Sequence, residues 1–159
     1  MSFQLLINIV LAFLWMFMNS DFTVGSFVTG FIIGLIAVYM LRNFLPGRFY
    51  LKRLYWMVRL VFIFIIELVK ANVDVVRIVM APKIDIHPGF YAYPNDLEEE
   101  WEVALLSTLI TLTPGTVVVA ISEDYSIIYI HGLDMDNADE EIANIKTSFE
   151  NVIKEVAKP

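Results

Sequence analysis

The segment Leu109–Asp134, "LITLTPGTVVVAISEDYSIIYIHGLD", carries the signals that decide the fold of the second half of the chain. It opens with the apolar end of a predicted helix, which Pro114 and Gly115 terminate in a tight turn. Two runs rich in β-branched and aromatic residues follow, Thr116–Ile121 and Ile127–His131, on either side of a polar "SEDYS" loop. This pattern predicts a helix followed by a β-hairpin.

The residues on both sides of this segment complete a small domain. Upstream, Phe90–Tyr93 is a predicted edge strand, and Asp96 is a predicted N-cap for the helix that leads into the turn. Downstream, the acidic stretch Asp134–Glu141 opens a last helix that runs to about Val156. The order strand, helix, strand, strand, helix predicts an acidic cytoplasmic α+β domain over residues 84–159.

The first 41 residues have a different character. They contain neither Lys nor Arg and form two apolar stretches, Phe3–Met18 and Phe22–Leu41, with three polar residues between them. A membrane-crossing helix needs about 20 apolar residues, and about 17 is near the lower limit. Residues 1–41 are therefore predicted to form a transmembrane helical hairpin. Gly30 and Gly34 allow close approach of a second helix, either within the hairpin or from a separate protein.

Residues 42–83 link these two parts as a basic loop and a long amphipathic, membrane-associated helix. Because positive charge near a helix end marks the cytoplasmic side of a membrane, the loop and the N-terminus are both predicted to be cytoplasmic. The predicted helix, Leu51–Met80, carries most of its charged residues within one arc of its surface. Two placements stay open for it: flat on the membrane surface, or tilted within a helical bundle.

Composition and charge support a two-part membrane protein. The chain is 58% hydrophobic, above the roughly half that is usual for soluble domains. Its net charge of −7 divides unevenly, because residues 1–83 carry a net +5 and residues 84–159 a net −12. There is no cysteine, which excludes disulfides and thiolate metal sites.

The motifs that mark catalysis are not found in the sequence. There is no glycine-rich phosphate-binding motif, the two histidines have no ligand partner at helical spacing, and no serine lies in a triad context. We therefore predict that the protein is not an enzyme, holds no cofactor or metal, and does not bind nucleic acid.

Two places in the chain are candidates for function. Glu67 is the acidic residue nearest the membrane in the predicted topology, and an ionisable residue there is a candidate for ion handling. The alternative is a structural ion pair with Lys70 or Arg59 on the same face of the helix. The other place is the turn after the predicted helix, as a contact surface for a partner or simply a tight helix-to-strand connection. Its residues are Thr113, Pro114, Gly115 and Thr116.

Three stretches carry a resemblance to a known family. They are "PGRFYLKR" at Pro46–Arg53, "LLSTLITLTPGTVVVAIS" at Leu105–Ser122 and "YIHGLD" at Tyr129–Asp134. In this order, after a two-helix hairpin, they resemble the E subunit of Mrp-type (Mnh, Sha) multisubunit cation/proton antiporters. The resemblance extends over essentially the whole chain.

The resemblance implies an accessory subunit of a cell-membrane complex that exchanges cytoplasmic Na⁺ or Li⁺ for external protons and supports pH homeostasis. The expected partners are the other subunits and the lipid bilayer, with the transported ions handled by the complex. Because the two apolar stretches contain no Asp, Glu, Lys, Arg or His, assembly or stabilisation is expected and not a place in the ion path. Two alternatives remain: the equivalent small subunit of a membrane-bound hydrogenase-type complex, or a membrane-tethered module that senses cations or binds a partner.

Overall fold

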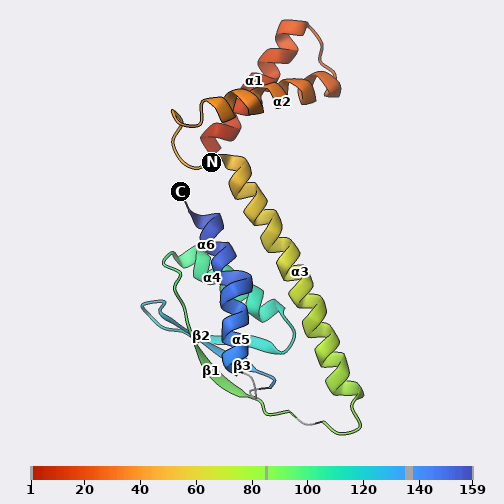
Figure 1. Ribbon diagram of the computed structural model, residues 1–159, viewed down its shortest axis with the longest axis vertical. Coiled ribbons are helices and arrows are strands. Elements are labelled where there is room, and N and C mark those ends of the chain that lie inside the picture. The colour runs from red at the N-terminus through yellow and green to blue at the C-terminus, as the bar shows by residue number, and fades with distance from the viewer. Residues whose placement is uncertain (1, 85, 135–137, 159) are drawn as a thin grey trace. The chain divides into compact units, whose positions relative to one another are not determined.

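The computed structural model describes residues 2–84, 86–134 and 138–158, and it divides into two compact units. The first unit comprises residues 1–55 with the last two residues of the chain, and the second comprises Trp56–Ala157. In the first unit, α1 (Ser2–Asn19) and α2 (Val24–Met40) pack together as a hairpin (Figure 1). The Thr23 side chain caps α2 by accepting a hydrogen bond from the Ser26 amide.

Two glycines of α2 set how closely the hairpin helices approach. A Cβ atom on Gly30 would lie 2.8 Å from both the Ala12 carbonyl oxygen and the Trp15 Cβ. A Cβ on Gly34 would collide with the side-chain oxygen of Asn8. At both positions the backbone of α2 therefore lies directly against α1. Of the two possibilities given for these glycines, packing within the hairpin is the one that the structure shows.

Only α2 is shorter than the apolar stretch that predicted it, Phe22–Leu41, whereas α1 extends one residue beyond each end of Phe3–Met18. α1 has 18 residues and α2 has 17, which at about 1.5 Å per residue gives roughly 26 Å for α2, against a hydrocarbon core of about 30 Å. α1 also includes the polar residues Gln4, Asn8 and Asn19. Among the described residues, no helix combines the length and the hydropathy needed to cross a membrane. This finding differs from the predicted transmembrane hairpin over residues 1–41.

The long third helix, α3, covers Tyr50–Met80, close to the predicted Leu51–Met80. Within the second unit, Leu60 is buried in the hydrophobic core, and Trp56, Ile63 and Phe64 pack against that core. One face of α3 therefore packs against the hydrophobic core of the second unit. Many of its other apolar side chains remain exposed, including Phe62 at 63%.

The rest of the second unit has the predicted order of strand, helix, strand, strand, helix. The last helical segment is divided by one π-helical turn, η1. The elements are β1 (Gly89–Pro94), α4 (Glu100–Leu112), β2 (Thr116–Ile121), β3 (Ile127–Gly132), α5 (Ala138–Ile145), η1 (Lys146–Glu150) and α6 (Asn151–Ala157). The predicted start of the last helix includes residues 135–137, which lie outside the described residues.

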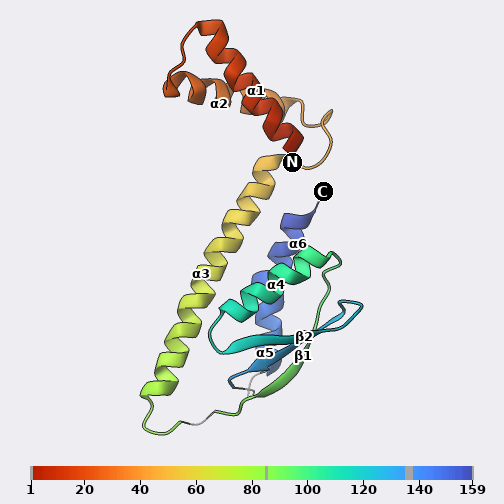
Figure 2. The ribbon, with the colours of Figure 1, turned by 180° about the vertical axis from the view of Figure 1, so that it is seen from behind.

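The three strands form an antiparallel sheet in the order β1-β3-β2, so the predicted edge strand is at an edge. Tyr91 of β1 and Val118 of β2 both pair with Ile130 of the central strand, and a bulge follows Val118. Because alternate residues of a strand share a face, one face presents Tyr91, Tyr93 and Ile130 to the core. α4 and the α5–α6 segment lie side by side in both views and supply the rest of that core (Figures 1 and 2).

The predicted N-cap of α4 is wrong. The helix begins after Glu99, whose amide donates to the Glu102 carboxylate at 3.4 Å. Asp96 lies too early in the chain to cap it and instead forms ion pairs with Lys146 at 2.8 Å and Lys154 at 3.5 Å. A long-range attraction to the terminal helix therefore determines the position of the Asp96 side chain, and this attraction is not encoded in the local pattern.

Candidate interaction cleft beside the Thr-Pro-Gly-Thr turn

A cleft of about 820 Å³ lies in the second unit between α3, the turn after α4, the end of β3 and the α5–η1 segment. It brings together two of the groups singled out in the sequence, the Glu67–Lys70 pair and the four residues of the turn Thr113–Thr116. The charged residues of its lining are Glu67, Lys70, Asp74, Asp134, Glu140 and Glu141. Arg59 is not among the lining residues, and its guanidinium lies 4.8 Å from the centre of the Trp56 ring. Gly30 and Gly34 belong to the first unit.

The turn that forms one wall of the cleft is held by its own hydroxyl groups. Thr113 donates to the Leu109 carbonyl at 2.9 Å, and Thr116 donates to the Ile110 carbonyl at 2.8 Å. These bonds satisfy carbonyl groups that the end of a helix leaves without partners. Gly115 has φ +97°, a left-handed conformation that favours glycine, and its carbonyl accepts from the Leu133 amide at 2.8 Å. The wall is therefore tied to both α4 and the end of β3.

Glu67 connects the opposite wall to α5. Its carboxylate accepts a hydrogen bond from Lys70 at 2.8 Å and from the Asn144 amide at 3.5 Å. The Glu67 side chain is only 12% exposed, whereas that of Lys70 is 61% exposed. The acid is thus fixed within the cleft, while the ammonium group that balances it faces solvent.

Glu141 adds a second carboxyl group to the cleft, and its surroundings raise its pKa. Desolvation is the main cause that raises its pKa, and repulsion from Glu140 and Glu67 adds to the shift, while the nearby Tyr91 hydroxyl partly offsets it. The contact with Tyr91 does not meet the geometry of a regular hydrogen bond. Burial, with the Glu141 charge adding, raises the pKa of Tyr91 in turn.

The cleft therefore concentrates negative charge. Its lining contains five carboxylates and one ammonium group, an arrangement that attracts cationic groups and repels anions. Among the described residues, no group of three or more His, Asp or Glu side chains is arranged to hold a metal ion. The chemistry that this lining supports is electrostatic recognition.

Sequence reasoning did not select Asp134, Glu141 or Asn144 as residues of this site. They are 60 to 80 positions beyond the part of α3 that they face, and no local motif links them to it. The one available signal was the excess of acidic residues in the second half of the chain, which does not say which of them converge.

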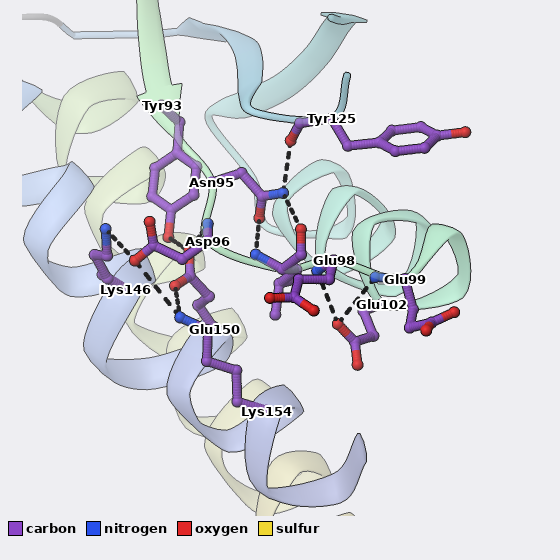
Figure 3. A network of polar contacts seen from close by, with 11 residues as sticks. Tyr93, Asn95, Asp96, Glu98, Glu99, Glu102, Tyr125, Lys146, Glu150 and Lys154 are labelled. Carbon is purple, nitrogen blue, oxygen red and sulfur yellow. Dashed lines mark hydrogen bonds and ion pairs between the residues drawn. The ribbon is translucent and has the colours of Figure 1, made fainter. Parts of the chain in front are cut away.

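A polar network fixes the terminal helix that forms part of the cleft wall (Figure 3). Tyr93 donates to the Glu150 carboxylate at 2.6 Å, and Lys154 donates to the same group at 2.8 Å. Lys146 pairs with Asp96 at 2.8 Å. Glu150 lies in the π-helical turn, a local widening of the helix that is often found at functional sites. The contacts of Tyr93 and Asp96 join the terminal helix to β1 and to the residues just after it, so they set where η1 lies.

The chain is similar in sequence to a known protein family and to named members of it. A family described as "Na+/H+ ion antiporter subunit" (MNHE) matches residues 8–156. The "Na(+)/H(+) antiporter subunit E1" of Staphylococcus aureus strain JH9 is 48% identical over 158 residues, which is 99% of each chain, and that of strain Newman matches equally well.

Two solved structures contain similar chains. One, the membrane-bound sulfane sulfur reductase (MBS), an archaeal respiratory membrane complex, has a chain with 25% identity and a TM-score of 0.56 over 98% of this chain and 99% of that chain. The other, the Mrp complex from Dietzia sp. DQ12-45-1b, has a chain with 32% identity and a TM-score of 0.47 over 57% of this chain and 86% of that chain.

Proposed function

The chain belongs to the Na⁺/H⁺ ion antiporter subunit family, and we propose that it is an accessory subunit of a multisubunit antiporter that exchanges Na⁺ or Li⁺ for protons. The observation that carries this proposal is the 48% identity to an antiporter E1 subunit over nearly the full length of both chains. The role is assembly and stabilisation of a membrane complex used for cation efflux and pH homeostasis.

The composition of the hairpin supports an accessory role. Neither α1 nor α2 contains an Asp, Glu, Lys, Arg or His residue, and groups of this kind mark proton and ion paths inside membranes. The buried polar side chains of α1 make contacts within the protein: Gln4 donates to the backbone of the loop after α2, and Asn8 donates to the Tyr50 hydroxyl at 2.7 Å. Neither helix therefore supplies an acidic or basic side chain for a proton or ion relay.

We place the hairpin in the bilayer beside other subunits, with the N-terminus and the second unit on the cytoplasmic side. The apolar outer faces of both helices support this placement, with Phe17 at 67% and Ile36 at 55% exposure. The cations that follow α2 favour the cytoplasmic side. Because each helix is slightly shorter than the hydrocarbon core, this placement depends on neighbouring subunits or on local thinning of the bilayer.

The acidic cleft is proposed as a contact site for a cytoplasmic loop of another subunit. Such loops carry an excess of Lys and Arg, which suits a lining of five carboxylates beside the turn Thr113–Thr116. In this proposal Glu67 positions the cleft through Lys70 and Asn144 and does not carry ions.

Deletion of the gene tests the role. We expect loss of the assembled complex on native gels and loss of Na⁺/H⁺ antiport in everted membrane vesicles, both restored by the wild-type chain. The variant Glu67→Gln/Glu141→Gln tests the cleft by weakening co-purification of partner subunits. Glu98→Gln/Glu123→Gln removes the same charge from residues outside the cleft and serves as its control. Cation flux through the lone reconstituted chain, or an active complex without it, would refute the accessory role.

Accessibility labelling tests the topology, because the chain has no native cysteine. Cysteine at Glu123 should react with an impermeant reagent only from the cytoplasmic side, and cysteine at Asp21 only from outside. Reaction of the Glu123 position from outside alone would contradict the proposed orientation.

One observation favours a second candidate. The chain of the MBS complex aligns over 98% of this chain, so the equivalent subunit of a hydrogenase-type or related respiratory complex is the alternative. Affinity purification from the native membrane separates the two. Co-purification with subunits that carry redox cofactors would favour the alternative, and their absence beside antiporter subunits would favour the first proposal.

A further inference from the structure

We propose that the loop after α2 and the first turn of α3 form a binding surface for anionic phospholipid headgroups. The surface consists of Arg42, Lys52 and Arg53 together with the aromatic residues Phe44 of the loop and Tyr39 in the last turn of α2. It depends on the proposed function in one respect only, the association of the first unit with a membrane.

The surface is strongly positive. Residues 1–55 contain four cations, all between positions 42 and 53, and a single acidic residue, Asp21. Arg42 and Lys52 are exposed. Among the described residues, no carboxylate forms an ion pair with Arg42, Lys52 or Arg53. The positive charge is thus available to an external anion, and each Lys or Arg near an anionic membrane surface adds to the attraction.

A single buried side chain, Gln4 of α1, ties down the loop between Arg42 and the start of α3. The Gln4 amide nitrogen donates to the carbonyls of Pro46 and Gly47 at 3.1 Å and 3.2 Å, and its oxygen accepts from the Tyr50 amide at 3.1 Å. Gly47 has φ +80°, which the turn needs. Because the backbone is ordered before any ligand arrives, binding costs less conformational entropy than it would on a mobile loop.

Aromatic side chains give the surface the mixed character of the membrane interface. The Arg42 guanidinium lies 4.3 Å from the centre of the Tyr39 ring, and the Tyr39 and Phe49 rings meet edge-to-face at 5.5 Å. Phe44 is 86% exposed. Aromatic rings are enriched where headgroups meet acyl chains, so Phe44 can contact the lipid chains while the cations contact the phosphate. A free phosphate ion would use only the second of these contacts.

The test measures lipid retention by the full chain in mild detergent. Native mass spectrometry would compare phosphatidylglycerol with phosphatidylcholine for the wild type, for Arg42→Gln/Lys52→Gln, and for Arg77→Gln/Lys83→Gln. The last variant removes two exposed cations from the second unit and matches the charge change. We expect the wild type to prefer phosphatidylglycerol, and Arg42→Gln/Lys52→Gln to weaken its retention roughly fivefold for each cation removed. The control should keep the preference.

Equal retention of the two lipids by the wild type would overturn the proposal, as would equal losses in the two variants. Complete displacement of the lipid by inorganic phosphate would also overturn it, because the surface would then recognise phosphate alone. Arg42→Lys/Lys52→Arg keeps the charge and should retain the preference; its loss there would point to misfolding as the cause and refute the electrostatic account. Co-purification with partner subunits is scored separately, so the lipid proposal can fail while the accessory role stands.

Discussion

The hydroxyl oxygen of Tyr93 lies 2.6 Å from a carboxylate oxygen of Glu150, and both side chains are fully buried. This contact joins β1 to the π-helical turn of the terminal helix, 57 residues later in the chain. Lys154 compensates the charge of Glu150 at 2.8 Å. Since a buried carboxylate without partners is strongly unfavourable, the pair determines how the terminal helix docks on the sheet.

Removal of the Tyr93 hydroxyl is expected to destabilise the second unit. Tyr93→Phe leaves Glu150 without its shortest hydrogen bond and should cost about 1–3 kcal/mol, measured as the shift in urea unfolding of the full chain. Tyr129→Phe, at a position of β3 that is 41% exposed, is the matched control and should change stability by less than about 0.5 kcal/mol. Similar losses of stability in the two variants would show that the Tyr93–Glu150 hydrogen bond does not stabilise the second unit.

Added volume at Gly34 is expected to separate the hairpin helices. The Cβ of Gly34→Ala collides with the Asn8 side chain, so the variant should be destabilised by about 1–3 kcal/mol. At Gly25 the nearest contact of a Cβ is the Thr23 hydroxyl at 3.8 Å, and Ala is favoured over Gly in a helix. Gly25→Ala should therefore be neutral or stabilising. Thermal unfolding in detergent measures both, and the same sign of change in both would contradict the packing argument.

The left-handed backbone at Gly115 should make the turn sensitive to substitution. A Cβ there meets nothing closer than Leu133 at 3.7 Å, so the expected cost of Gly115→Ala is conformational, about 1–2 kcal/mol. Gly115→Asn should cost less, because asparagine tolerates positive φ. Urea unfolding of the two variants checks the order, and an asparagine variant that is less stable than the alanine variant would refute this explanation.

The pH dependence of stability should report on Glu141. Burial, with repulsion from Glu140 and Glu67, raises its pKa above the ordinary value of 4.5. A carboxyl group with a raised pKa stabilises the fold when protonated, so this contribution is complete below pH 4.5 and is lost as the pH rises through the raised value. Glu141→Gln should remove this loss and increase stability at neutral pH. Urea unfolding across that range measures it, with Glu123→Gln as an exposed control that keeps the wild-type profile.

The elements that depend on local signals were predictable. Pro114 and Gly115 end α4 where the pattern indicated, and the strands of the hairpin follow because alternation and turn residues act over a few positions. Asp96 was not predictable in the same way. It has the residue type of an N-cap, yet its position depends on Lys146 and Lys154, 50 or more residues away.

In the cleft, too, some contacts could be predicted from local sequence and others could not. The spacing of Glu67 and Lys70 on one helix face predicted their pairing, because residues three apart on a helix are neighbours. The approach of Asn144 and Glu141 to Glu67 has no local signal, since it depends on how α5 docks against α3. The Gln4 contacts with Pro46 and Gly47 are equally non-local, and they tie the basic loop to α1.

The amino-acid sequence by itself determined the contrast between a charge-poor apolar beginning, a basic middle and an acidic end, and it predicted the order of strands and helices in the last part, because composition and hydrophobic period act over neighbouring residues. Only the tertiary structure decided which acidic side chains converge in the cleft and which buried side chains hold the loop and the terminal helix. Those choices depend on packing between segments far apart in the chain, where burial makes each unpaired polar group costly and so selects one set of partners.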